Sequence, residues 1–242
     1  MNRSGFTLIE MVVTLIVGSV LVIGIAGFVE LGARGYVDTV DRQRLQTQAK
    51  FVVEKLTREV RHAVPNVFTS ENNCIAFYPI TYSGFYQING ADIDFIVGQD
   101  TPVGVAELQD LSMIINPTST LANANNFFGF NELIDDGNLV DEDTHFEMLG
   151  QATRLVGGSI ANRQYIFDAD NGEVEYCVTN GRVERNRQRL TDGLADDFEV
   201  SGTLTYLPVS VQMNGVVRLN LTFTQNEEVT NFQQDVQVLN VP

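Results

Sequence analysis

Residues 5–10 read Gly5-Phe6-Thr7-Leu8-Ile9-Glu10, and the nineteen residues that follow them, 11–29, carry no charge: MVVTLIVGSVLVIGIAGFV. At about 1.5 Å of rise per residue, a helix of this length nearly spans a bilayer core of about 30 Å. The short leader before it carries one positive charge, Arg3, which favours a cytoplasmic N-terminus. We therefore predict one N-terminal transmembrane helix and export of the rest of the chain.

Glu10 is the residue that an ordinary membrane anchor does not explain. A carboxylate near the start of a membrane segment is costly and is by default functional. One alternative is a cleaved Sec signal peptide or a signal anchor, because Gly24, Ala26 and Gly27 supply small residues for a cleavage site. Another is that Glu10 only reaches the cytoplasmic headgroups.

Beyond Tyr36 the apolar pattern becomes one-faced. Apolar residues recur at spacings of four and three, which predicts a continuous stem helix from Phe6 to about His62, ended by Pro65. Five stem glycines either weaken this helix by roughly 1 kcal/mol each relative to alanine or permit close helix packing. The apolar positions are Leu45, Ala49, Val52, Leu56, Val60 and Ala63, and the glycines are Gly18, Gly24, Gly27, Gly32 and Gly35.

The remainder of the chain predicts short strands separated by turns, and we expect residues 117–151 to be loop-rich. The fold class is therefore α+β, with a long N-terminal helix, first transmembrane and then amphipathic, packed on an antiparallel β-sheet head. Predicted strands are Cys74–Tyr78, Ile93–Val97, Leu111–Ile115, Tyr165–Phe167, Glu173–Val178, Leu204–Leu207, Val216–Phe223 and Phe232–Leu239, and predicted turns are Asp168–Gly172, Asn180-Gly181 and Asn214-Gly215.

The chain is acidic, with 15 Lys and Arg against 31 Asp and Glu and a net charge of −16. Nucleic acid is therefore not expected as a partner. Residues 63–153 contain thirteen acids and no Lys or Arg, and a basic segment follows at Arg182, Arg185, Arg187 and Arg189. These charges form either solvated faces or complementary docking surfaces between neighbouring subunits.

No HExxH, P-loop, GxSxG or CxxC pattern occurs, and His62 and His145 stand apart from any arranged nucleophile. We expect no catalytic residue, no cofactor and no metal site, so the chain is not expected to be an enzyme. Two acidic groups could supply oxygen ligands for calcium, but neither fits an EF-hand, and ordinary acidic loops are the favoured interpretation. They are Asp135, Asp136, Asp141, Glu142 and Asp143, and Asp168 with Asp170.

The stretch SGFTLIEMVVTLIV, residues 4–17, resembles the class III signal of type IV pilins and type II secretion pseudopilins. The resemblance implies that a prepilin peptidase cuts between Gly5 and Phe6 and methylates Phe6. It also implies that Glu10 is the subunit-assembly carboxylate, which meets the N-terminal ammonium of a neighbouring subunit. The implied partners are this peptidase, other major and minor pilins, the inner-membrane assembly platform and the inner membrane.

A weaker resemblance extends into the head. Residues 174–185, Val-Glu-Tyr-Cys to Arg-Val-Glu-Arg, and the C-terminal residues 236–242 are similar to larger minor pilins and J-type pseudopilins, closest to minor pilins of the mannose-sensitive haemagglutinin (MSHA) pilus. The implied organisation is a leader (1–5), a transmembrane and assembly helix (6–30), its amphipathic continuation (31–64) and a periplasmic β-rich head (65–242). The implied location is the inner membrane and then the filament or its tip.

Three other functions stay open at this point: a J-type pseudopilin, a tip adhesin that binds a surface glycan, and a membrane-anchored enzyme. A head of roughly 180 residues favours a minor subunit over a major one. Because such a head lies in an oxidising compartment, Cys74 and Cys177 are expected to form a disulfide, with two buried free thiols as the alternative.

The motif predicts that Gly5→Trp blocks processing, because the residue before the cut has to be small. In cells that carry this variant, immunoblots should show the full-length precursor in the inner membrane and no shortened chain. A Gly5→Trp chain that is shortened to the same length as the unaltered protein contradicts the assignment of the cut.

Overall fold

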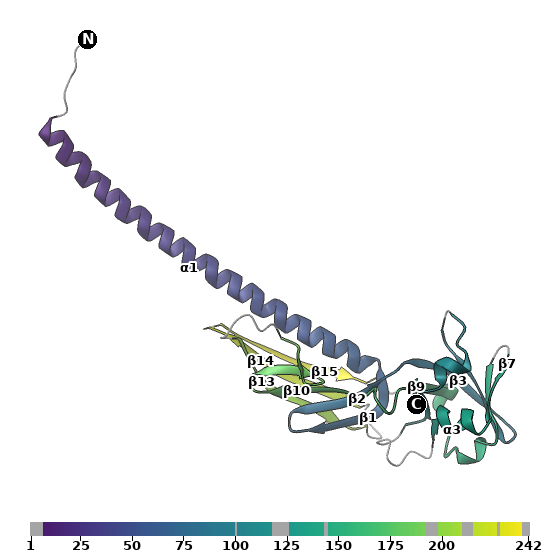
Figure 1. Ribbon diagram of the computed structural model, residues 1–242. Coiled ribbons are helices and arrows are strands. Elements are labelled where there is room, and N and C mark those ends of the chain that lie inside the picture. Colours follow the sequence, from purple (N-terminus) through teal and green to yellow (C-terminus); the bar gives the residue numbers. More distant parts are fainter. Residues whose placement is uncertain are drawn as a thin grey trace, which may run out of the picture. The chain divides into compact units, whose positions relative to one another are not determined.

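The computed structural model describes residues 7–99, 101–117, 126–142, 145–191, 198–209, 215–226 and 228–238. The chain divides into two units, residues 1–47 and 48–242. Figure 1 shows a long N-terminal helix followed by antiparallel strands, so the predicted α+β class is confirmed.

Helix α1 runs unbroken from Leu8 to Arg61 and is 54 residues long. It is the one helix in the described part of the chain that is long and apolar enough to cross a membrane, and no residue of its most apolar stretch is buried. A Cβ atom placed on any of the five stem glycines meets nothing within 4 Å. Within this subunit, therefore, those glycines neither interrupt the helix nor make room for a neighbouring group.

The C-terminal part of α1 belongs to the second unit and has a buried face. Ala49, Val52, Leu56 and Val60 are fully buried, as the sequence spacing predicts. Ala63 does not continue this face, because the helix ends at Arg61 and Ala63 is the first residue of a strand. Pro65 lacks a backbone N–H and disfavours helical geometry at the residue before it, which accounts for the change of structure.

The second unit also contains two antiparallel sheets. β13 contacts the first sheet, and the rings of Phe68 and Tyr206 stack with centroids 4.8 Å apart. The first sheet has the order β1 (Ala63–Glu71), β2 (Cys74–Pro79), β10 (Val174–Thr179), β11 (Arg182–Arg185) and β12 (Gln188–Arg189), and the other has the order β13 (Phe198–Leu207), β14 (Val216–Gln225) and β15 (Glu228–Gln237).

A seven-stranded antiparallel sheet is inserted between two neighbours of the first sheet. β2 pairs with β10, yet residues 80–173 separate them in sequence. We call residues 82–167, which form the seven-stranded sheet, the inserted lobe. Its strand order is β6 (Phe127–Gly129), β5 (Ser112–Ile115), β9 (Arg163–Phe167), β3 (Tyr82–Asn89), β4 (Asp92–Val97), β8 (His145–Met148) and β7 (Leu139–Glu142).

The inserted lobe has its own apolar core. Ile93 and Phe95 lie in it, together with Phe130 from α3 (Phe130–Asp135) and Leu108 from α2 (Val105–Leu108). A smaller cluster joins the lobe to β1 through Val64, Val67, Ile114, Tyr165 and Phe167. The second unit therefore consists of the end of α1, two antiparallel sheets, and the inserted lobe, which has an apolar core of its own.

Several turn and strand predictions are confirmed. Asn180 and Gly181 both have positive φ, 49° and 72°, and form the two-residue turn between β10 and β11. Along β14 the side chains of Val217, Leu219 and Phe223 are buried in alternation with more exposed neighbours. This alternation is what a strand with one buried face requires.

Two predictions about local structure are wrong. The described part of residues 117–151 is not loop-rich, because it holds β6, α3, β7 and β8; each has only three to six residues, too few to show a clear apolar period. Asn214-Gly215 is not a two-residue turn, because Leu207 pairs with Val216 and residues 208–215 connect β13 to β14. Asn214 itself lies outside the described residues.

Gly202 provides a test of the β13–β14 pairing. Its φ is 134°, and a Cβ atom there would lie 2.0 Å from the carbonyl oxygen of Asn220. Gly202→Ala should therefore lower the free energy of unfolding by about 2 kcal/mol or more, measured by urea denaturation followed by circular dichroism. The control is Gly129→Ala, where a Cβ meets nothing within 4 Å and the expected change is about 0.5 kcal/mol or less. Equal effects of the two substitutions would contradict this backbone geometry.

Candidate functional site

The predicted processing site lies at the start of α1. Gly5 and Phe6 are outside the described residues, which begin at Thr7. The Thr7 hydroxyl accepts a hydrogen bond from the backbone N–H of Glu10, with an N···O distance of 3.4 Å. Thr7 therefore caps the helix, a role that the sequence analysis did not assign. The signal was available, because Thr-x-x-Glu ahead of an apolar run is a capping pattern.

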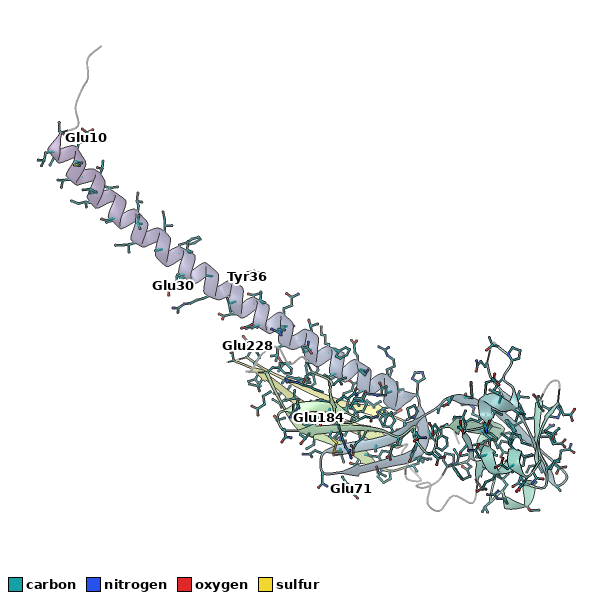
Figure 2. All side chains as sticks on the ribbon, in the orientation of Figure 1. Glu10, Glu30, Tyr36, Glu71, Glu184 and Glu228 are labelled. Carbon is teal, nitrogen blue, oxygen red and sulfur yellow. A yellow bond between two sulfur atoms is a disulfide. The ribbon has the colours of Figure 1, made fainter. Side chains whose placement is uncertain are left out.

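Glu10 lies in the first turn of α1 and is exposed (Figure 2). A carboxylate at this position is favoured by the positive end of the helix dipole. Among the described residues, none forms an ion pair with Glu10. By contrast Glu30, further along the same helix, forms an ion pair with Arg34, with an oxygen–nitrogen distance of 2.5 Å. The described part of the chain thus offers Glu10 a helix terminus but no ion-pair partner.

The apolar half of α1 is exposed on every side. Leu15, Ile23 and Phe28 expose 67%, 72% and 79% of their surface. Apolar surface of this extent is stable only in lipid or against other apolar surface. The helix can therefore be accommodated in a bilayer or among the helices of other subunits.

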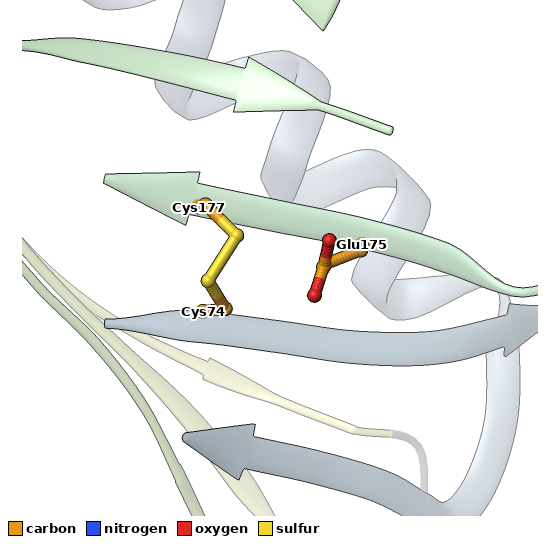
Figure 3. A group of neighbouring side chains, drawn as sticks. All are labelled: Cys74, Glu175 and Cys177. Atoms are coloured by element: carbon orange, nitrogen blue, oxygen red, sulfur yellow. A yellow bond between two sulfur atoms is a disulfide. The ribbon is translucent and has the colours of Figure 1, made fainter. Parts of the chain in front are cut away.

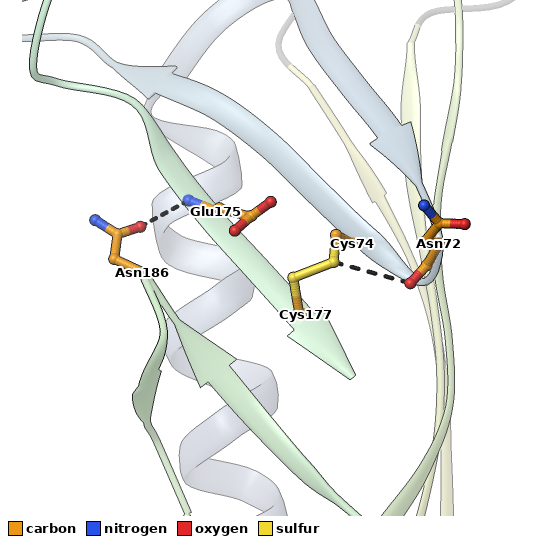
Figure 4. The surroundings of a disulfide bond; sticks show 5 residues. All are labelled: Asn72, Cys74, Glu175, Cys177 and Asn186. Atoms are coloured by element: carbon orange, nitrogen blue, oxygen red, sulfur yellow. Dashed lines mark hydrogen bonds between the residues drawn. A yellow bond between two sulfur atoms is a disulfide. The ribbon is translucent and has the colours of Figure 1, made fainter. Parts of the chain in front are cut away.

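The predicted disulfide is present. Cys74 begins β2, Cys177 lies directly opposite it on β10, and the two sulfur atoms are bonded (Figure 4). Beside them the backbone N–H of Glu175 donates to the side-chain oxygen of Asn186 at 2.8 Å. β2 and β10 flank the inserted lobe, and the disulfide joins them at the end of their paired stretch that lies away from the lobe, beyond the pair Phe77 and Val174.

One group of side chains has the spacing of a metal site, and it is formed by Cys74, Glu175 and Cys177 (Figure 3). Metal binding by cysteine requires the thiolate. Both sulfur atoms are committed to the disulfide, so this trio is not a candidate metal centre.

The acidic groups considered for calcium have different structural roles. Asp168 Oδ1 accepts hydrogen bonds from the backbone N–H groups of Asp170 and Asn171, at 3.1 and 2.8 Å, so this stretch is a turn. Asp135, Asp136 and Asp141 are exposed. Asp143 lies outside the described residues.

A polar contact connects α1 to the first sheet inside the second unit. Arg185 Nε donates to Glu59 Oε2 at 2.9 Å. Both side chains lie near the buried Tyr176, whose hydroxyl makes no hydrogen bond of ordinary geometry with a described residue. Burial first, and the charge of Glu59 second, raise the pKa of the Tyr176 hydroxyl above its usual value. Tyr176 is therefore a neutral core residue.

The predicted basic segment is partly neutralised within the chain. Arg185 pairs with Glu59, and Arg182 pairs with Glu184 at 3.1 Å. Arg187 lies exposed in the turn before β12. The acids of residues 63–153 lie mostly in the inserted lobe, so the two charge groups occupy different sheets.

Comparison with known proteins finds a match for the N-terminal residues of the chain. Residues 1–26 match the family model described as the prokaryotic N-terminal methylation motif. No curated protein and no solved structure matches the chain. The motif, which is the prepilin signal of type IV pilin-like proteins, supports a pilin or pseudopilin role. It also implies processing by prepilin peptidase and assembly with other pilins.

The disulfide should contribute a large share of the stability of the second unit. A closed loop of about 100 residues corresponds to about 4.7 kcal/mol in the chain-entropy model, and losses of about 2–5 kcal/mol are typical; the separation here is 103 residues. The double variant Cys74→Ser/Cys177→Ser should therefore unfold at lower urea concentration, and reduced unaltered protein should behave in the same way. The disulfide is contradicted by two reactive thiols in denatured, unreduced protein.

Proposed function

We propose that the chain is a minor pilin of a type IV pilus, placed at the initiating or tip-proximal end of the filament. The observation that carries this proposal is the methylation motif, together with an assembly carboxylate that has no cation partner in the described chain. The apolar half of α1, in which no residue of the most apolar stretch is buried, supports it, because a helix that leaves the membrane needs apolar neighbours.

Glu10 gives this assembly a register. After the cut, Phe6 carries a free ammonium at the edge of the membrane. A buried ammonium and a buried carboxylate are each costly when unpaired. When subunits stack so that Glu10 of one faces the ammonium of another, both costs fall together, and a shifted stacking loses this gain.

The inserted lobe supports a minor rather than a major subunit. A major pilin packs against identical copies of itself on all sides. An insertion with its own core would enlarge each of these copies and would therefore have to be accommodated at every contact between them. Within the pilin-like group we assign the chain to the MSHA type, where its head resembles MshO. The processed subunit would reside in the inner membrane with a periplasmic head and then in the filament, as an interaction protein without catalytic activity.

The J-type pseudopilins of type II secretion are the alternative that shares the same N-terminal motif. The genes beside this one separate the two, because pilus and secretion systems have different assembly genes. Neighbouring pilus genes support the proposal, and neighbouring secretion genes overturn the MSHA assignment while leaving the pilin-like processing intact.

The role of Glu10 predicts that Glu10→Gln reduces the number of surface pili. The substitution keeps the shape of the side chain but removes its charge, so the neighbouring ammonium loses its partner. Folding of residues 48–242 and removal of the leader should be unchanged. Pili should be counted by electron microscopy and co-purified minor pilins by immunoblot, at matched protein level.

Glu30→Gln is the matched control, because it removes the same charge from the same helix at an exposed position. We expect normal piliation for this variant. If Glu10→Gln leaves pilus number and partner recovery at the level of Glu30→Gln, Glu10 has no assembly role.

A further inference from the structure

The outer face of the inserted lobe carries an unusual set of side chains. On paired strands β3 and β4, Tyr86 and Phe95 point into the lobe core. Because side chains alternate along a strand, the pair Phe85 and Ile96 lies on the opposite face. The pair Gln87 and Asp94 lies on that face too. Phe85 and Ile96 are about half exposed there, at 50% and 46%.

A cleft opens on this face. It has a volume of about 320 Å³ and is lined by Phe85, Gln87, Asp94, Ile96 and His145, among others. A second cleft, of about 290 Å³, shares Ile96 and His145 with the first and continues to Asp141 and Glu142. Together they form an acidic groove with apolar walls. No Lys or Arg lines either cleft.

Asp94 has a carboxylate oxygen without a hydrogen-bond partner. The residue is only 4% exposed. Its Oδ2 accepts a hydrogen bond from Gln87 Nε2 at 2.9 Å, whereas no described residue hydrogen-bonds its buried Oδ1. A buried polar atom of this kind costs free energy, and the cost is larger for a charged group. Stability within the subunit does not explain why a carboxylate is placed here.

The surrounding charges do not supply a counter-ion. Residues 63–153 contain no Lys or Arg. Arg163 on β9 lies opposite Phe85. Burial raises the pKa of the Tyr165 hydroxyl, and the nearby guanidinium of Arg163 partly opposes this increase. His145 lines both clefts, but a permanently charged cation beside Asp94 has to come from another molecule, and Asp141 and Glu142 nearby favour its approach.

We propose that this cleft binds an arginine side chain presented by a partner protein. A guanidinium carries five N–H donors in a planar fork, so it can donate to the amide oxygen of Gln87 while its positive charge lies beside the Asp94 carboxylate at the cleft wall. Its face can stack on the exposed ring of Phe85, while its aliphatic stem covers Ile96. Lysine offers a point charge without a plane to stack, so it fits this cleft less well.

The test uses the full chain in neutral detergent micelles and the capped tripeptide acetyl-Gly-Arg-Gly-amide. Saturation-transfer difference NMR detects weak binding to a protein of this size. The matched control peptide carries citrulline, which keeps the shape of arginine and most of its donors but has no charge. Binding by the arginine peptide, with the citrulline peptide about tenfold weaker or more, supports the proposal. Equal binding by both peptides, or by neither, overturns it.

Two variants tie the binding to Asp94. Asp94→Asn keeps a side-chain oxygen for the Gln87 hydrogen bond and should weaken the arginine peptide about tenfold or more. Asp110→Asn removes the same charge from an exposed position of the lobe outside both clefts, and should leave binding unchanged. Thermal unfolding of both variants checks that the fold is retained. If both variants lose binding equally, the effect is general electrostatics and the cleft is not an arginine site.

Discussion

The carboxylate of Glu10, which has no ion-pair partner among the described residues, is the constraint on which the proposed assembly depends. Glu10 is stabilised by the N-terminus of α1, but that interaction is worth only about 0.3–1 kcal/mol when exposed. Burial among apolar helices costs far more unless a positive charge is found. In the proposed assembly, the ammonium that the cut creates on Phe6 of a neighbouring subunit supplies that charge.

The second unit holds the end of α1 and the inserted lobe in different parts of its structure. The final turns of α1 are buried in the second unit and tied to β11 through Glu59 and Arg185. The inserted lobe departs from the first sheet between β2 and β10, and the Cys74–Cys177 disulfide joins these two strands at the far end of their pairing. An insertion with its own core can therefore vary in shape while the stem and its sheet stay fixed. Its acidic outer groove is one such specialised surface.

Much of this architecture could be predicted from the sequence, and the physical reasons for success and failure differ by region. The stem was predictable because an uncharged run and then a regular apolar period extend over fifty residues. β14 was predictable because one of its faces is buried and the other is not. The short strands β6 and β7 were missed, because three or four residues cannot show a period. Thr7 was missed as a cap although its pattern with Glu10 was visible.

The inserted lobe and its cleft could not be predicted, since both depend on pairings between distant strands. Nothing in the local pattern indicates that β2 pairs with β10 across residues 80–173, and only that pairing makes the intervening strands an insertion. Asp94 likewise looks like an ordinary acid in a short strand. Its significance comes from burial, from its bond to Gln87 and from the absence of a second donor among the described residues.

The central claim, that the chain is processed and assembled as a pilin-like subunit, is tested most directly by the intact mass of the mature protein isolated from cells. The account predicts a chain that begins at Phe6 and carries one additional methyl group on its N-terminal nitrogen. A chain that begins at Met1, or one cut after Ala26 as by a signal peptidase, contradicts it.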